Sequence, residues 1–181
     1  MLSREAVIWQ RLTHANIVPF RGVTLDPLRI VSEWMSGGDL TGYINLNPRV
    51  NRVHLVSPAP IPPRNMALFF FQLIDVAKGL QYLHLRDVIH GDLKGVSTSS
   101  SPNFRISFIG ALQPNILVDG SGCARITDFG LARNQEIIYQ TTMSNGHTAR
   151  WTAPEILDGE NTVSKEADVF AFAMVMIEVY W

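Results

Sequence analysis

Three short motifs that follow one another along the chain constrain most strongly what this sequence can fold into. They are His90-Gly-Asp-Leu-Lys94, Asp128-Phe-Gly130 and Ala153-Pro-Glu155, and Lys165-Glu-Ala-Asp-Val169 comes after them. A lone Asp-Phe-Gly triplet recurs by chance, but several such motifs in one order are specific. The first two motifs each contain an aspartate, and carboxylates serve both as proton acceptors and as ligands of hard metal ions. The two motifs therefore provide two candidate functional carboxylates, Asp92 and Asp128.

The composition is that of a folded protein inside the cell. Of the 181 residues, 46% are hydrophobic and 17% are charged, and the net charge is −1. This is enough apolar material for a core, and the near-neutral charge gives no electrostatic reason to expect nucleic acid or an anionic membrane as a partner. The single cysteine, Cys123, cannot form an internal disulfide, and the first twenty residues lack the apolar core of a signal peptide. No apolar run reaches the ~18 residues of a membrane span, so we predict an intracellular, cytoplasmic protein.

Hydrophobic periodicity predicts a mixture of helices and short strands. The predicted helices cover 3–12, the stretch after Ser36-Gly-Gly-Asp39 as far as Ile44, 73–86 and 165–181. The predicted strands cover 17–23, 28–34, 88–89, 116–118 and 124–127, with a turn at Asp26-Pro27. The last helix is apolar nearly all round, which is typical of a buried helix. Residues 131–150 are polar and rich in Thr, Ser, Asn and Gly, and we expect a mobile loop there.

In this order and register, the motifs resemble the signature of the eukaryotic protein kinases. The stretch from Gly146 to Glu155 is most similar to the tyrosine-kinase-like serine/threonine type, while Arg150-Trp151 also resembles tyrosine kinases. The resemblance implies an α+β, protein kinase-like fold over 1–181, with a partial N-lobe sheet in 2–34 and an incomplete, mostly helical C-lobe in 35–181. It also implies ATP and Mg²⁺ as cofactors and a protein substrate that offers a Ser, Thr or Tyr hydroxyl.

The resemblance assigns roles in phosphoryl transfer to four residues. Asp92 matches the carboxylate that accepts the proton of the substrate hydroxyl, and Lys94 matches the lysine near the γ-phosphate. Asp128 matches the magnesium-binding aspartate, and Asn115 matches the asparagine that binds a second metal ion. Asp92, Lys94 and Asn115 are therefore the expected catalytic residues, and Asn115 and Asp128 are the expected metal ligands.

The assignment of Asn115 depends on two stretches of unusual composition. The family places its asparagine five residues after the catalytic aspartate, whereas Asn115 follows Asp92 by 23 residues; omitting the 18 residues of 96–113 restores that spacing. Omitting 56–72 likewise joins 51–55 to the helix expected from Leu73. Together these stretches hold five of the ten prolines and only two charged residues.

Both stretches begin with Val-Ser and end in Gln. Codons for these residues can carry the nucleotides found at the two ends of an intron. We interpret 56–72 and 96–113 as foreign inserts, either two retained introns or a genuine pair of lineage-specific loops. Prolines at 58, 60, 62 and 63 disfavour a regular helix in the first. We therefore expect both inserts to be loops that pack on nothing, with the chain returning to the fold at Leu73.

The resemblance also extends to a nucleotide site. Ser32-Glu-Trp-Met35 is similar to the family's gatekeeper and hinge, where backbone groups of Glu33 and Met35 would hold adenine and Asp39 would reach the ribose. Leu117 and Asp128 complete the expected nucleotide-binding set.

A third set of residues matches the stacked apolar spine of active kinases. Its members are Trp9, Phe20, His90 and Phe129, and Asp168 would anchor the spine from below. Taken singly, the four spine residues are equally compatible with an ordinary core.

The sequence departs from the family in three respects. Glu5 matches the glutamate of the regulatory helix, but neither a Gly-x-Gly-x-x-Gly loop nor a Val-Ala-Ile-Lys-type strand precedes it. At the other end, the chain stops within the helix that holds Asp168. Gly91 replaces the arginine that usually precedes the catalytic aspartate, so a phosphate on Thr141, Thr142 or Ser144 would lack its usual partner. We therefore expect this chain to transfer phosphate poorly.

Three alternatives remain open at this point. A small-molecule phosphotransferase of the aminoglycoside-kinase type also uses His-Gly-Asp followed by Asn, although Lys94, Ala153-Pro-Glu155 and the loop 131–150 favour a protein kinase. The chain can also be a catalytically inactive pseudokinase or interaction module, or the product of a gene model whose true product is spliced and longer.

Overall fold

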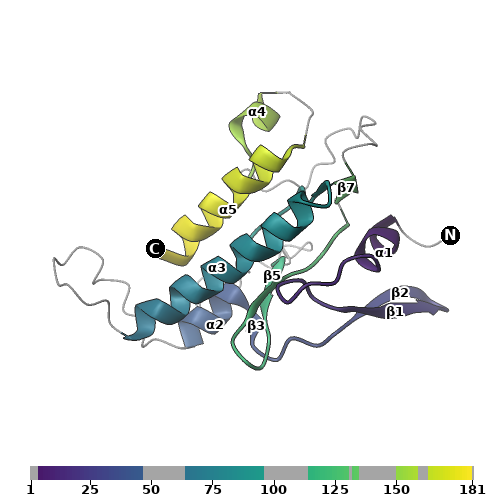
Figure 1. Ribbon diagram of the computed structural model, residues 1–181, viewed down its shortest axis with the longest axis horizontal. Helices are drawn as coiled ribbons and strands as arrows, with labels where there is room; N and C mark the ends of the chain where they lie inside the picture. Colours follow the sequence, from purple (N-terminus) through teal and green to yellow (C-terminus); the bar gives the residue numbers. More distant parts are fainter. Residues whose placement is uncertain are drawn as a thin grey trace, which may run out of the picture.

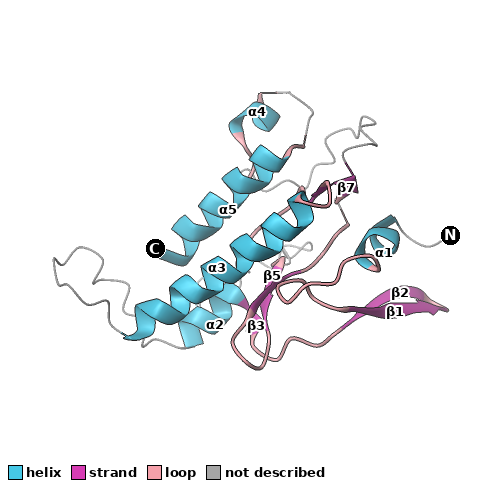
Figure 2. Cartoon of the chain, viewed as in Figure 1, coloured by secondary structure: helices cyan, strands magenta, loops and turns pink. Residues whose placement is uncertain are grey.

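The computed structural model describes residues 4–46, 64–95, 114–130, 132–134, 150–158 and 163–180. A helix and a two-stranded hairpin form a small amino-terminal part, and helices cover short strands in a larger part (Figures 1 and 2). The two long helices, α3 (Arg64–His84) and α5 (Lys165–Tyr180), pack against each other and run in opposite directions (Figure 1). The predicted α+β class is confirmed.

Helix α1 (Arg4–Trp9) is shorter than the predicted 3–12 because the backbone tightens after Trp9. The amides of Arg11 and Leu12 donate to the carbonyls of Ile8 and Trp9 at 3.1 and 3.0 Å. Bonds between residues three apart are typical of the last turn of a helix.

Strands β1 (Phe20–Leu25) and β2 (Leu28–Ser32) form an antiparallel hairpin around the predicted turn at Asp26-Pro27. β1 begins three residues later than predicted because residues 17 and 18 pair with the larger part of the protein instead. Ile17 forms a parallel bridge with Ile126, and the Val18 amide donates to the Ile126 carbonyl at 2.9 Å.

A three-stranded antiparallel sheet with the order β3-β5-β6 lies at the centre of the larger part. It consists of β3 (Gly38–Asp39), β5 (Ile116–Val118) and β6 (Ala124–Ile126). A second pair joins β4 (Val88–Ile89) to β7 (Arg133–Asn134), with Val88 opposite Asn134. The strands predicted at 88–89 and 116–118 are confirmed, and the one predicted at 124–127 ends at Ile126. Most of 131–150 lies outside the described residues.

Helix α2 (Leu40–Leu46) follows β3 directly, close to where a short helix is predicted. Helix α3 begins at Arg64, so the expectation of a loop up to Leu73 is wrong for 64–72. All four prolines precede Arg64, and a helix that starts after the last of them loses no internal hydrogen bond. Gln72 is 4% exposed, so this end of the predicted insert packs into the protein. Residues 51–63 and 96–113 lie outside the described residues.

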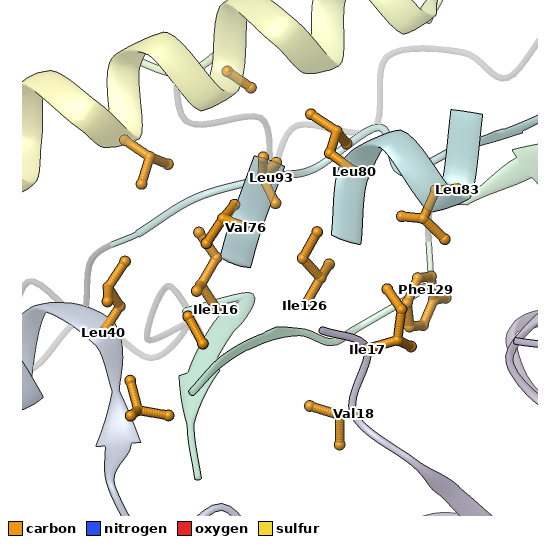
Figure 3. Packing of buried hydrophobic residues seen from close by; sticks show 14 of the residues in the cluster. Ile17, Val18, Leu40, Val76, Leu80, Leu83, Leu93, Ile116, Ile126 and Phe129 are labelled. Atoms are coloured by element: carbon orange, nitrogen blue, oxygen red, sulfur yellow. The ribbon is translucent and has the colours of Figure 1, made fainter. Parts of the chain in front are cut away.

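The hydrophobic core lies between α3 and the central sheet (Figure 3). Val76, Leu80 and Leu83 on α3 face Ile116 and Ile126 on the strands. Gly79 lets the helix approach closely, because a Cβ there would lie 2.7 Å from the carbonyl oxygen of Asn16. The contact therefore requires glycine.

Helix α5 is buried on one face only, which corrects the prediction of an all-round buried helix. Ala171, Val175 and Val179 are buried, whereas Val169 and Ile177 are 54% and 50% exposed. An apolar face of α5 is thus open to solvent. None of the described helices is long and apolar enough to cross a lipid bilayer.

Candidate active site

Asp168, in the first turn of α5, fixes the backbone of the His90–Lys94 motif. Its side chain is 2% exposed and accepts hydrogen bonds from the amides of His90 and Gly91 and from Nε2 of His84, each at 2.8 Å. A buried carboxylate is tolerated when its oxygens are satisfied in this way. The predicted anchoring role of Asp168 is confirmed. The contribution of His84 has no local signal in the sequence, because it lies 84 residues from Asp168.

A continuous stack of rings joins the hairpin to this motif. The ring centroids of Phe20 and Trp9 are 6.2 Å apart, those of Trp9 and Phe129 are 5.3 Å apart, and those of Phe129 and His90 are 5.5 Å apart. Nε2 of His90 lies 3.0 Å from the carbonyl oxygen of Thr127, which fixes the imidazole ring. The predicted spine is therefore confirmed as a set of contacts, and it connects α1 to the Asp128-Phe-Gly130 motif.

Asp92 sits at the centre of a small polar network. Its Oδ2 accepts hydrogen bonds from Nζ of Lys94 at 2.8 Å and from Nδ2 of Asn115 at 3.1 Å. Nδ2 of Asn115 also donates to the Asp92 carbonyl at 2.5 Å. The Lys94 and Asp92 side chains are 10% and 20% exposed. Three residues predicted from sequence alone thus meet, even though 23 residues separate Asp92 from Asn115.

The backbone of Asn115 ties Asp128 to the same network. The Asn115 amide donates to the Lys94 carbonyl at 3.1 Å, and its own carbonyl accepts from the Thr127 amide at 3.0 Å. Asp128 follows Thr127 with a φ of 62°, an uncommon conformation for an aspartate, and its Oδ1 accepts from the Gly130 amide at 3.2 Å. These backbone bonds place the loop that carries Asp128 beside Asn115.

Glu5, on α1, lies close enough to Asp128 for their charges to interact. Burial and the charge of Asp128 both raise the pKa of Glu5. A Cβ on Gly130 would lie 3.2 Å from Oδ1 of Asp128 and 3.8 Å from Oε2 of Glu5, so both carboxylates border the same glycine. The sequence identified Glu5 as the glutamate of the regulatory helix but did not predict this contact between like charges.

The residues around Asn115 and Asp128 fit a magnesium site. Asn115 is fully buried, and its Oδ1 has no hydrogen-bond partner among the described residues. A buried amide oxygen without a partner is costly, and oxygen atoms of this kind are ligands of hard cations. A cation beside Asp128 would also relieve the repulsion with Glu5. The described residues form no cluster of three or more His, Cys, Asp or Glu side chains suited to a metal, and Mg²⁺ is commonly held by one or two protein ligands together with substrate phosphates.

Comparison with known proteins identifies the family. The sequence profile of the family described as Protein tyrosine and serine/threonine kinase matches residues 1–97 and 112–181. The chain belongs to this kinase family. The unmatched residues, 98–111, lie within the second predicted insert, whereas the first matched segment includes 56–72.

Curated relatives of this kinase chain include proteins from plants, amoebae and animals. It is 33% identical over 180 residues to serine/threonine-protein kinase CTR1 of Arabidopsis thaliana, 31% over 185 residues to dual specificity protein kinase zakA of Dictyostelium discoideum, and 31% over 179 residues to cyclin-dependent kinase 15 of Homo sapiens. The alignments cover 97–98% of this chain but 18%, 21% and 34% of the relatives. The chain thus spans about a third or less of their length. The predicted resemblance to serine/threonine kinases is confirmed.

The predicted hinge of the kinase follows β2 directly. The amide of Glu33 donates to the Pro19 carbonyl at 3.0 Å, and its carboxylate forms an ion pair with Arg21. Met35 is buried, and its carbonyl accepts from the Gly38 amide at 3.1 Å. The Glu33 amide therefore already has a hydrogen-bond acceptor within the protein, and only its carbonyl is left to bind adenine.

The two other predicted nucleotide contacts, Asp39 and Leu117, are paired in the register of β3 and β5. Asp39 also has a local role that the sequence analysis missed, because its Oδ1 accepts from the Gly42 amide at 2.7 Å and so caps α2. The sequence signal was available: an aspartate directly before a predicted helix is a common cap. The structure therefore places Asp39 and Leu117 side by side at one end of the sheet.

A cleft opens beside Asp92 between its loop, the segment Trp151–Ala153 and the start of α5. Trp151 is held by Glu178, whose Oε2 accepts from Nε1 of the indole at 3.1 Å. Burial raises the pKa of Glu178, although Trp151 and Arg150 act in the opposite direction. This part of the site was not predicted. The only signal was the position of Trp151 two residues before Ala153-Pro-Glu155.

Proposed function

We propose that this protein transfers the γ-phosphoryl group of Mg-ATP to a serine or threonine hydroxyl of a protein substrate. The observation that carries the proposal is the hydrogen-bonded network of Asp92, Lys94 and Asn115, adjoining the Asp128 loop. Phosphoryl transfer relies on positioning and on charge stabilisation, and this network supplies a base, a cation and two metal-ligand candidates in one place. The names of the relatives support a serine or threonine acceptor, with tyrosine as the further candidate.

Asp92 is the proton acceptor in this proposal. Lys94 and Asn115 both donate to its Oδ2, which holds the carboxylate in one orientation. Its Oδ1 has no hydrogen-bond partner among the described residues, so this oxygen is assigned to the substrate hydroxyl. We assign the polypeptide that carries that hydroxyl to the surface beside the small cleft between Asp92 and Trp151. Its apolar lining by Ile156, Val163 and Ala171 favours a substrate with an apolar residue near the acceptor.

The nucleotide is assigned to the far side of the same network. The carbonyl of Glu33 and the backbone of Met35 would bind adenine, Leu117 would contact the base, and Asp39 would reach the ribose with the oxygen that does not cap α2. Asn115 and Asp128 would hold Mg²⁺, which when bound neutralises charge on the triphosphate. Lys94 would place its ammonium group near the transferred phosphate.

An assay of the full-length protein tests the assignment of Asp92. The substrates are Mg-ATP labelled at the γ-phosphate and a generic serine/threonine protein substrate. Asp92→Asn should lower kcat by roughly 10²–10⁴-fold, the usual contribution of a positioned base. Asp87→Asn is the matched control, because Asp87 pairs with Lys165 at the surface. Equal turnover by wild type and Asp92→Asn would refute the assignment.

The second candidate function is a catalytically inactive interaction module. The observation that favours it is the proximity of the like charges of Glu5 and Asp128, while Lys94 forms its ion pair with Asp92 instead. A folded protein with no turnover and no thermal stabilisation by Mg-ATP would support this reading. Stabilisation by Mg-ATP together with turnover would exclude it.

We also propose that the kinase acts in the cytoplasm and that 96–113 is a foreign insert in its domain. The single cysteine supports the first statement, and the absence of 98–111 from the family match supports the second. Genomic sequence around codons 56, 72, 96 and 113 would distinguish retained introns from genuine loops.

A further inference from the structure

The positively charged side chains of this kinase are unevenly neutralised. Where the structure describes both groups, five arginines and lysines pair with a carboxylate: Arg21, Lys94, Arg125, Arg150 and Lys165. Among the other side chains that the structure describes, no such partner is found for Arg4, Arg11, Arg29, Lys78 and Arg86. Three of these unpaired cations, Arg4, Arg11 and Arg86, line a single cleft.

The cleft lies between α1 and the turn that joins α3 to β4. It is an open hollow of about 280 Å³, and its wall between the arginines is entirely aliphatic, formed by Val7, Ile8, Leu12 and Val88. Val7 and Ile8 are partly exposed there, whereas Leu12 and Val88 are buried. The surface therefore combines fixed positive charge with an apolar floor.

Arg86 is held in place at the rim of this cleft. Its guanidinium lies over the Tyr82 ring, 4.7 Å from the centroid, and Tyr82 is itself stacked on His14 with centroids 4.7 Å apart. The Tyr82 hydroxyl accepts from the Thr13 amide at 2.8 Å, which ties α3 to the segment after α1. A guanidinium ordered in this way loses little freedom when it binds a ligand.

The carboxylates that adjoin Arg4 and Arg86 in the sequence are directed elsewhere. Asp87 follows Arg86 in the sequence but pairs with Nζ of Lys165 at 2.7 Å. Glu5 follows Arg4, but its carboxylate lies toward Asp128 and Gly130. In the described part of the chain, the three arginines of the cleft therefore keep their charge for a ligand.

We propose that this cleft is a docking site for a phosphorylated peptide segment of a partner protein. Guanidinium groups bind phosphate through paired, charge-assisted hydrogen bonds, and clusters of arginines recognise phosphorylated peptides. The aliphatic wall would receive an apolar side chain next to the phosphoresidue. The proposal concerns a surface away from Asp92 and does not depend on the phosphoryl-transfer activity proposed above.

Charge and shape favour this occupant over other anionic partners. A membrane surface is bound by exposed clusters of about four to eight basic residues, whereas here three surround a concave apolar wall. Single-stranded nucleic acid needs aromatic platforms for its bases, and none of the residues that line the cleft is aromatic. A docked peptide would also contact α1, which carries Trp9 of the ring stack.

The test uses the full-length protein and an array of short peptides. Each peptide has a central phosphothreonine or phosphoserine flanked by varied Leu, Ile, Val, Ala and Phe, and matched arrays carry the unphosphorylated residue or Glu. The strongest phosphopeptide is then labelled with fluorescein and titrated by fluorescence anisotropy. We expect Kd to rise at least about tenfold in Arg11→Gln/Arg86→Gln, equivalent to about 1.4 kcal/mol. We expect no change in Arg29→Gln, a control for an exposed and unpaired arginine outside the cleft.

Three results would overturn the proposal. One is the absence of phosphate-dependent binding on the whole array. Another is equal binding by wild type and the double variant, when circular dichroism shows both to be folded. The last is binding to vesicles that contain phosphatidylserine without any binding to phosphopeptides, which would identify a membrane surface as the occupant.

Discussion

Replacing Asp168 with asparagine tests how the fold supports the active site. Asp168 is 2% exposed, and one oxygen accepts from the Gly91 amide while the other accepts from the His90 amide and from His84. These bonds hold the backbone immediately before Asp92. The substitution keeps the size of the side chain but exchanges one acceptor oxygen for an amide nitrogen. One of the two backbone donors then faces another donor.

The expected loss follows from these contacts. A hydrogen bond to a charged group contributes about 1.5–3 kcal/mol, and a buried donor left without a partner costs about 1–3 kcal/mol. Together these two contributions predict that Asp168→Asn loses roughly 2.5–6 kcal/mol in the free energy of unfolding. Folded domains are stable by about 5–15 kcal/mol, so the variant should fold but with a clearly lower stability.

Urea denaturation followed by circular dichroism measures this loss, and the phosphotransfer assay measures its effect on the site. Asp158→Asn is the control, because Asp158 is exposed and lies at the carboxyl end of α4. We expect Asp168→Asn to lose both stability and kcat and the control to lose neither. A free energy of unfolding within about 1 kcal/mol of wild type would refute the reasoning, since that is the net value of one ordinary hydrogen bond.

Three further predictions concern pH and chain length. Burial and Asp128 raise the pKa of Glu5, so its ionised form destabilises the fold at neutral pH and this cost disappears as the pH falls. Glu5→Gln should therefore have a higher free energy of unfolding at pH 7, with a weaker dependence on pH, when measured by urea denaturation. Superimposable denaturation curves of wild type and variant would contradict this. Burial raises the pKa of Asp119, but hydrogen bonds from Ser121, Arg125 and Cys123 outweigh it and lower the pKa to about 2. The ionised carboxylate therefore contributes its full stabilisation above the ordinary pKa of 3.8, and this contribution is lost as the pH falls toward 2. Asp119→Asn should abolish this acid-dependent loss in titrations followed by circular dichroism. Equal dependence of stability on pH in wild type and variant would count against it. Deleting 96–113 should raise the Tm. The Asn115 amide already donates to the Lys94 carbonyl at 3.1 Å, so a connection shorter by 18 residues joins the same two positions and costs about 1–2 kcal/mol less to close. A lower Tm would argue against the interpretation of 96–113 as a foreign insert.

Much of the site was predictable because its chemistry demands particular residue types in a particular order. Asp92, Lys94 and Asp128 were identified from motifs, and Asn115 from the spacing left when 96–113 is omitted. The spine residues Trp9, Phe20, His90 and Phe129 followed from the same register, and the structure confirms their contacts. Short strands at 88–89 and 116–118 were also correct, because an apolar run between turn residues has few other options.

The start of α3 shows where local reasoning fails. Four prolines within six residues disfavour a helix across them, and the unusual composition of 56–72 predicts that the loop continues to Gln72. The helix nevertheless begins at Arg64, directly after the last proline. Proline restricts only its own neighbourhood, whereas the residues after it extend a helix that is anchored by the buried face from Leu73 onward.

The sequence by itself determined which residues carry the chemistry and in which order the elements occur, because motif identity and periodicity are local properties. Only the tertiary structure decided how those residues are held. His84 reaches Asp168 across 84 residues, Glu5 meets Asp128, and Arg4, Arg11 and Arg86 converge on one cleft from two distant segments. Such contacts depend on how the helices pack on the sheet, and buried groups accept whichever partner that packing brings within hydrogen-bonding distance.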